Sequence, residues 1–257
     1  ILDEVQYVPE LLPTLKRRVD ANDKKGQYFL TGSQNLSVLK TVAESMAGRV
    51  GILNLDGFTP EEMLGLGAQK GWLPLYLNDP AALRTSMRGV YREFSNLAHF
   101  LWRGTYPGIL TIPDSGITTY FRSYLQTYVD RDVRTMENIK ELADFNRFLN
   151  LIAALSGQEI NTSQLGREIG IAPATARRWL DLLTYSYQWL ELFPYHGNTI
   201  KRISGKRKGH LRDTGLACYL QRISSSEGVA AHRHDRARHP DGQHGPRLGR
   251  SCPDLGA

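Results

Sequence analysis

The sequence predicts a chain in two parts, an α/β unit with parallel strands followed by a mostly α region that ends in a winged helix-turn-helix. Three observations support this fold class. The first 35 residues alternate strand, helix and strand, a helix-turn-helix pattern begins near residue 161, and a basic run starts at residue 201. With 257 residues, 41% of them hydrophobic, the chain can bury the cores of one or two domains.

Composition argues against several classes of protein. No apolar run approaches the roughly 18 residues that a membrane span needs, so we expect no membrane partner. No signal-peptide pattern is found at the N-terminus. The two cysteines, Cys218 and Cys252, give no disulfide framework, which favours a cytoplasmic location. A formal net charge of +6 permits an anionic partner such as DNA without requiring one.

The N-terminal unit has the pattern of strand, helix and strand. Residues 1–4 are typical of a buried strand that ends in two acids, and residues 28–33 are a second β-prone run. Between them, apolar residues of the segment 9–19 recur at helical spacing. Strands of a βαβ unit are parallel, and ligands bind at their carboxyl ends. The polar residues expected at that edge are Asp3, Glu4, Thr31, Ser33 and Asn35.

These residue types suit a site that hydrolyses a nucleotide, because phosphoryl transfer depends mainly on positioning and charge stabilisation. Asp3 could bind Mg²⁺, directly or through water, and with Thr31 forms the predicted cofactor-binding pair. Glu4 would orient and polarise the attacking water. Asp-Glu after a strand is alternatively a solvated turn. The predicted catalytic residues are Glu4, Ser33 and Asn35, which would contact that water or the γ-phosphate, and Arg49, which would supply positive charge.

Three short motifs resemble a known family. Residues 2–6 (Leu-Asp-Glu-Val-Gln), 29–35 (Phe-Leu-Thr-Gly-Ser-Gln-Asn) and 44–50 (Glu-Ser-Met-Ala-Gly-Arg-Val) look like the Walker B, sensor 1 and arginine motifs of a group of prokaryotic AAA+-type ATPases. The resemblance implies a partial P-loop NTPase core over residues 1–66, with ATP and Mg²⁺ as cofactors. The family's Walker A loop, whose N–H groups and lysine hold the phosphates, is not found. We therefore expect a fragment with little or no ATPase activity of its own.

Residues 67–150 are predicted to form a helical linker region. The segment 120–134 carries aromatic and aliphatic residues on one helical face. Its end, residues 128–133, resembles a signature of the conserved uncharacterised domain that follows the ATPase core in the family. Asp130 and Asp132 could touch a nucleotide in a neighbouring subunit, or make ion pairs at a solvated helix end.

Residues 151–223 predict the winged helix-turn-helix. Asn161 and Gln164 have the spacing of a helix N-cap and its partner, and a second helix begins near Ala174 after a short turn. Residues 189–193 and 200–203 favour two strands that would form the wing. In the family that this region resembles, a nuclease-like region follows the winged helix.

Basic side chains on the second helix and in the wing could neutralise DNA phosphates. Alternatively, this region packs on its own ATPase core or on a partner, and the cations are only solvated. A non-enzymatic interaction protein, or a homo-oligomer, is a further open alternative. The DNA-binding candidates are Arg177, Arg178, Lys201, Arg202, Lys206, Arg207 and Lys208.

Composition changes abruptly after Ile223. Residues 224–257 hold four of the seven histidines and five arginines but no aromatic residue. Such a segment cannot bury enough apolar surface to offset the entropy of ordering it, so we expect disorder. Translation out of frame is our hypothesis for its origin. Its histidines and Cys252 match no standard zinc spacing, so no metal site is expected.

Overall fold

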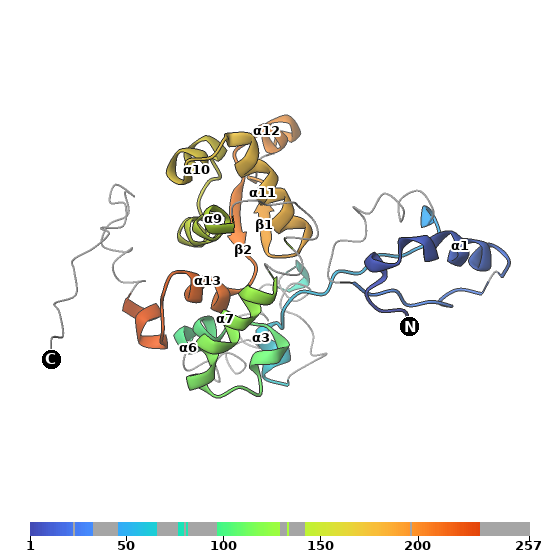
Figure 1. Cartoon of the computed structure of the whole chain (residues 1–257), viewed down its shortest axis with the longest axis horizontal. Helices are drawn as coiled ribbons and strands as arrows, with labels where there is room; N and C mark the ends of the chain where they lie inside the picture. The colour runs from blue at the N-terminus through green and yellow to red at the C-terminus, as the bar shows by residue number, and fades with distance from the viewer. Residues whose placement is uncertain are drawn as a thin grey trace.

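The computed structural model describes residues 1–22, 24–32, 46–65, 77–79, 81, 97–128, 133, 142–195 and 197–231. Over these residues the chain is mostly helical and contains one two-stranded sheet. Figure 1 shows the residues around α1 set apart from a larger body that contains α3 and the helices from α6 to α13. An extended segment before α3 joins the two parts.

The N-terminal part has the predicted order of elements. Leu2 pairs with Leu30 in a parallel bridge, which confirms the parallel pairing but limits it to one position of the predicted strand 28–33. The predicted helix 9–19 is confirmed as a 3₁₀ turn, η2 (Pro9–Leu11), followed by α1 (Leu12–Asp20). Leucines at spacing i, i+3 on α1 are buried in a small separate core, whose fully buried members are Leu12, Leu15 and Met46.

The short helix α3 (Pro60–Met63) begins at a complete capping box. The Thr59 hydroxyl accepts a hydrogen bond from Glu62 N at 3.3 Å, and Thr59 N donates to the Glu62 carboxylate at 2.8 Å. Met63 packs against the core of the larger body. The chain therefore passes into the larger body before residue 66, where the sequence predicted the end of the ATPase part.

The larger body is built from helices around one aromatic core. Trp179 makes edge-to-face contacts with Phe145 and Phe148, with ring centroids 5.3 Å apart in both pairs. Its elements are α6 (Leu97–Arg103), η4 (Pro107–Ile109), η5 (Asp114–Gly116), α7 (Ile117–Tyr128), α9 (Leu142–Ala154), α10 (Thr162–Ile169), α11 (Pro173–Tyr185), β1 (Trp189–Leu192), α12 (Thr199–Ser204), β2 (Lys208–Leu211) and α13 (Thr214–Leu220).

The boundary predicted between residues 150 and 151 falls inside α9. Buried residues from Trp102 to Leu220 belong to one continuous cluster, so α6 and α7 share a core with the elements that follow. The physical reason is the unbroken helical spacing of Phe148 and Ile152 across the boundary, with no glycine or proline to end the helix. Asp130 and Asp132 lie outside the described residues.

The two predicted helices after residue 160 are confirmed. Asn161 caps α10 by accepting a hydrogen bond from Gln164 N at 3.1 Å. The helix ends at Gly170, whose φ of 90° is the left-handed conformation that glycine adopts at helix ends. Pro173 then begins α11, and Ala176 and Leu180 are fully buried on its inner face, as the pattern indicated.

The second strand of the hairpin was placed wrongly from the sequence. β1 confirms the strand predicted at 189–193, but its antiparallel partner is β2, not residues 200–203, which belong to helix α12. β2 crosses the Trp189 ring at Gly209, where an added Cβ would overlap the ring. Only a glycine lets this strand pass beneath the indole, and that requirement arises from tertiary packing.

A third stretch of backbone joins the hairpin on its other edge. Gly157 N donates to Gly209 O at 2.7 Å, and Ile160 N donates to Arg207 O at 2.9 Å. We call residues 157–160 the bridging segment. Along the chain the elements follow in the order α9, bridging segment, α10, α11, β1 and β2.

The expectation of disorder from residue 224 onward is wrong at its start. Residues 226–231 are helical, and Val229 packs against the main core. The segment also forms local hydrogen bonds at its start, where Gly228 N donates to Ser225 Oγ at 3.3 Å. Residues 232–257 lie outside the described residues.

Candidate functional site

The acidic pair lies at the edge where the first two strands end. Leu2 N donates to Phe29 O at 2.8 Å, and Thr31 N donates to Leu2 O at 2.9 Å. The Asp3 carboxylate accepts a hydrogen bond from the Thr31 hydroxyl and another from Glu4 N at 3.0 Å. The structure therefore brings Asp3, Glu4 and Thr31 together, as parallel pairing requires.

Glu4 has an unusual backbone conformation at this edge. Its φ of 53° and ψ of 44° are left-handed, where a residue other than glycine costs roughly 1 kcal/mol or more. The turn leads directly into the 3₁₀ helix η1 (Val5–Tyr7), whose first residue is buried. Backbone strain at a sharp turn after a strand is common where a side chain must be aimed at a ligand.

The other predicted catalytic residues are not brought to this edge by the described structure. Ser33 and Asn35 lie outside the described residues. Arg49 donates from Nε to Asp20 Oδ1 at 2.5 Å and from Nη1 to the Ala47 carbonyl at 3.0 Å. The hydrogen bond from Arg49 lowers the pKa of Asp20. Arg49 thus pairs with the end of α1.

A cleft of about 1180 Å³ separates the acidic edge from the larger body. Glu4, Thr31 and Gly32 line one side. Residues of the hairpin and of the turn before α13 line the other, among them Tyr187 and Arg212. Ligand pockets in proteins typically measure about 300–1,000 Å³, so this cleft is large enough for a nucleotide.

Arg212 lies in the wall of this cleft, and the sequence analysis, which counted it in the basic run of the wing, gave it no place in a nucleotide site. Its guanidinium pairs with Asp56, and its Cζ lies 5.5 Å from the centre of the Tyr187 ring. Tyr187 in turn donates its hydroxyl to Asn54 Oδ1 at 3.0 Å. Asp56 is 156 residues away from Arg212 in the chain, so no local sequence pattern predicts this ion pair.

Asp213, next to Arg212, is buried and has a structural role. It caps α13 by accepting from Leu216 N at 2.6 Å, and it accepts from both Thr105 N at 2.6 Å and Thr105 Oγ1 at 2.9 Å. Burial raises its pKa, while these donors act in the opposite direction. Gly104 approaches so closely that a Cβ there would lie 2.6 Å from Asp213 Oδ1.

The extended segment 52–58 is fastened to the larger body near the cleft. Phe58 N donates to Thr105 O at 2.8 Å, and Gly57 packs so tightly on Thr105 that a Cβ would overlap it. Together with the ion pair of Asp56 with Arg212, these contacts join the N-terminal part to the turn after α6 and to the turn before α13.

The predicted DNA-binding cations divide into two groups. Arg177 is partly exposed, with 40% of its side chain accessible, and it pairs with Asp181 at 3.0 Å and with Glu191 at 2.8 Å. Glu191 also binds Arg207 at 3.2 Å, and its side chain is only 8% exposed. A buried carboxylate needs such partners, so these arginines hold the hairpin against α11.

The remaining candidates face solvent. Arg178, Arg202 and Lys208 are exposed, and Lys206 is exposed although it lies 3.3 Å from Glu159. The side chain of Lys201 lies outside what the structure describes.

Two protein-family models match the chain. One, an AAA domain, matches residues 1–64. The other, a domain of unknown function (DUF8612), matches residues 95–227, which is 133 of the 257 residues. The chain belongs to the DUF8612 family. The DUF8612 match begins just before α6 and ends beyond α13, so it coincides with most of the larger body and includes Arg212.

Two curated relatives of this DUF8612 protein are uncharacterized proteins, Mb2031c of Mycobacterium bovis and Rv2008c of Mycobacterium tuberculosis. Each is 27% identical over 215 residues, which cover 84% of this chain and 42% of the relative. The chain thus spans about two fifths of the length of these relatives. No solved structure matches it.

Two kinds of feature are absent from the described residues of the DUF8612 chain. No helix there is long and apolar enough to span a bilayer. No three or more His, Cys, Asp or Glu side chains gather there into a group that could hold a metal by themselves.

Proposed function

We propose that residues 1–66 are the C-terminal half of an AAA-type nucleotide-binding core and that this protein uses ATP and Mg²⁺. The observation that carries the proposal is the parallel pairing of Leu2 with Leu30, which sets Asp3 beside Thr31. The AAA-domain match to residues 1–64 supports the same assignment. The cleft beside this edge has room for a triphosphate and its base.

The residues at this edge fit a magnesium ion that is bound together with phosphates. Mg²⁺ usually takes one or two protein oxygens and completes its shell with water and phosphate oxygens. Asp3, which is exposed, and the Thr31 hydroxyl are the oxygens available, and the ion would neutralise phosphate charge. Glu4, the next residue, would orient the attacking water.

ATP hydrolysis by the 257-residue chain, and by a chain extended with any residues encoded before Ile1, tests this proposal. We expect Glu4→Gln to retain ATP binding and to reduce hydrolysis by the competent chain at least about 100-fold, because the residue acts on the water. Glu10→Gln, an exposed acid on η2, is the matched control and should be silent. If the Glu4→Gln variant hydrolyses ATP at the wild-type rate, Glu4 is not the residue that orients the attacking water.

A second candidate function is DNA binding by a winged helix. The order α9, bridging segment, α10, α11 and hairpin supports it, as do the exposed Arg178, Arg202 and Lys208. Anisotropy of a labelled duplex, titrated at several salt concentrations, tests it. We expect Lys208→Ala to weaken binding and to reduce the salt slope by about one. Arg17→Ala on α1 is the control, and an equal loss in both variants would count against the winged-helix assignment.

If neither ATP nor DNA binds, a non-enzymatic interaction protein is the remaining candidate.

A further inference from the structure

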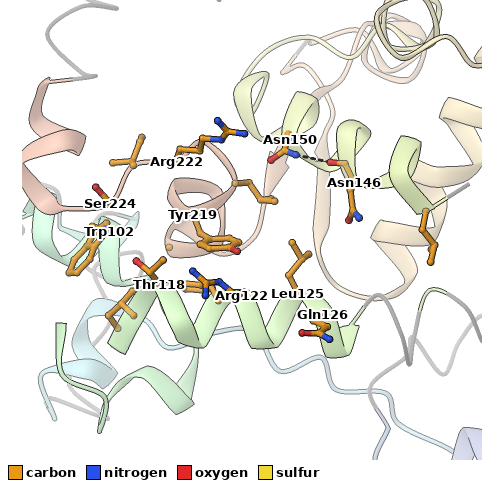
Figure 2. Close-up of a pocket in the computed structure, with 16 residues that line it drawn as sticks. Trp102, Thr118, Arg122, Leu125, Gln126, Asn146, Asn150, Tyr219, Arg222 and Ser224 are labelled. Atoms are coloured by element: carbon orange, nitrogen blue, oxygen red, sulfur yellow. Dashed lines mark hydrogen bonds between the residues drawn. The ribbon is translucent and has the colours of Figure 1, made fainter. Parts of the chain in front are cut away.

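A second pocket, of about 740 Å³, lies in the larger body between α6, α7, α9 and α13. Among the described residues, none lines both this pocket and the cleft at the acidic edge. Figure 2 shows α7 along one side, with Asn146 and Asn150 of α9 across from it and Tyr219 of α13 between them. We refer to this pocket as the α7–α9 groove.

The walls of the α7–α9 groove are two rows of side chains at helical spacing. Each row places residues at i, i+4 and i+8, so each extends about 12 Å, or a little over two helical turns. The rows are Thr118, Arg122 and Gln126 on α7, and Leu142, Asn146 and Asn150 on α9. Two parallel helical rows of this length match the shape of a third helix laid between them.

The floor of the groove is apolar. Phe121 is 1% exposed, and Tyr219 and Ile223 are half-buried against the main core. Leu125 and Leu142 extend this surface toward the two walls. A helix with one apolar face would remove these side chains from water, at roughly 25 cal/mol for each Å² covered.

Among the described residues that line the groove, the charged side chains are all cationic. They are Arg122 and Arg222. Neither arginine forms an ion pair within the described part of the chain, and both side chains are exposed. An occupant with carboxylates beside its apolar face would therefore find cations on two sides of the groove.

Arg222 stands where a glycine would be the ordinary choice. Its φ is 59°, and the turn it makes after α13 is closed by Ile223 N donating to Cys218 O at 2.9 Å. A left-handed residue with a side chain costs roughly 1 kcal/mol relative to glycine. The guanidinium of Arg222 is therefore placed at the rim of the groove although its backbone conformation is unfavourable for a residue other than glycine.

We propose that the α7–α9 groove binds an amphipathic helix of a partner protein, with apolar residues on the floor and acidic residues facing Arg122 and Arg222. The charge argument separates this occupant from residues 232–257 of the same chain, which carry five arginines and three aspartates and have the wrong sign. Recognition of this kind uses anchors at i, i+3, i+4 and i+7 of the bound helix.

A defined pair of probes tests the proposal on the full chain. The first is a fluorescein-labelled peptide of roughly 16 residues, long enough to be partly helical, with leucines on one face and glutamates beside them. The second has lysine in place of every glutamate. We expect fluorescence anisotropy to show the glutamate peptide binding about tenfold more tightly. Binding that does not distinguish the two peptides, or no saturable binding of the first by about 1 mM, overturns the proposal.

Variants locate the binding and separate it from folding. Arg122→Glu should weaken the glutamate peptide about tenfold and strengthen the lysine peptide, and a gain of this kind cannot come from unfolding. Arg222→Gly should weaken the glutamate peptide severalfold without lowering the melting temperature, because glycine suits the left-handed turn. Arg167→Glu, at an exposed site on α10 outside the groove, is the matched control and should change neither affinity.

The oligomeric state provides a further decisive outcome. If sedimentation shows concentration-dependent self-association that Arg122→Glu abolishes, the groove is an interface between copies of this chain, and the partner-helix proposal is wrong. A chain that stays monomeric while the glutamate peptide binds supports it.

Discussion

The Asp213 carboxylate accepts two hydrogen bonds from Thr105. The backbone N of Thr105 donates at 2.6 Å, and the Thr105 hydroxyl donates at 2.9 Å. The pair joins the turn after α6 to the start of α13 across 108 residues of sequence. Because Asp213 is 1% exposed, water cannot replace either bond. The stability of the larger body therefore depends on this carboxylate.

Asp213→Ala should destabilise the protein strongly. It removes the cap of α13 and leaves the N–H groups of Thr105 and Leu216 buried without an acceptor, at about 1–3 kcal/mol for each unsatisfied group. We expect a loss of roughly 3 kcal/mol in the free energy of unfolding, measured in urea. Glu159→Ala, at a half-exposed carboxylate on the surface, is the comparison and should change it by less than about 1 kcal/mol.

The free energy of unfolding should depend on pH in a way that is set by the titration of Asp213. Burial raises its pKa above 3.8, so the native state holds the proton to a higher pH than the unfolded chain does. The stabilisation from protonating this group is complete below the unfolded pKa and is lost as pH rises through the raised, folded pKa. Wild type should therefore lose stability relative to Asp213→Asn over that window. A difference between the two proteins that is independent of pH would contradict the shift.

Gly209→Ala should disrupt the hairpin. A methyl group at this position would overlap the Trp189 ring, and relief requires the indole or the strand to move, at roughly 1–3 kcal/mol or more. The loss should be visible as a lower melting temperature and a changed tryptophan emission. Gly197→Ala is a clean control, since no heavy atom lies within 4 Å of the added methyl group.

Arg212→Met should loosen the attachment of the 52–58 segment. The variant removes the pair with Asp56, and an ion pair whose carboxylate is 63% exposed contributes at most about 1 kcal/mol. We expect the Phe58 amide, which donates to Thr105 O, to exchange its hydrogen roughly threefold to fivefold faster. Arg17→Met on α1 should leave that exchange rate unchanged.

Local patterns predicted the elements whose causes are local. The Asn161 cap, α10, α11 and the helix after Pro9 were all found where composition and spacing indicated. The parallel pairing of Leu2 with Leu30 followed from the strand, helix, strand order. The cap and the helices depend on residues close together in the chain, and the strand pairing follows from the order of the elements.

Features that depend on distant residues were missed. β2 begins at Lys208 because Gly209 must pass beneath Trp189, which is 20 residues earlier. The ion pair of Arg177 with Glu191, on the next element, was not predicted. At the candidate site, the sequence pointed to Asp3 and Thr31, while Arg212 became visible only once the fold set it beside Asp56.

Thr105 serves both of its neighbours at once, since its carbonyl accepts from Phe58 while its N–H and hydroxyl hold Asp213. Asp213 begins α13, and the last turn of α13 contributes Tyr219 and Leu220 to the α7–α9 groove. Helix α13 therefore links the two cavities in the structure: Asp213 at its start lines the cleft, and Tyr219 and Leu220 at its end line the groove.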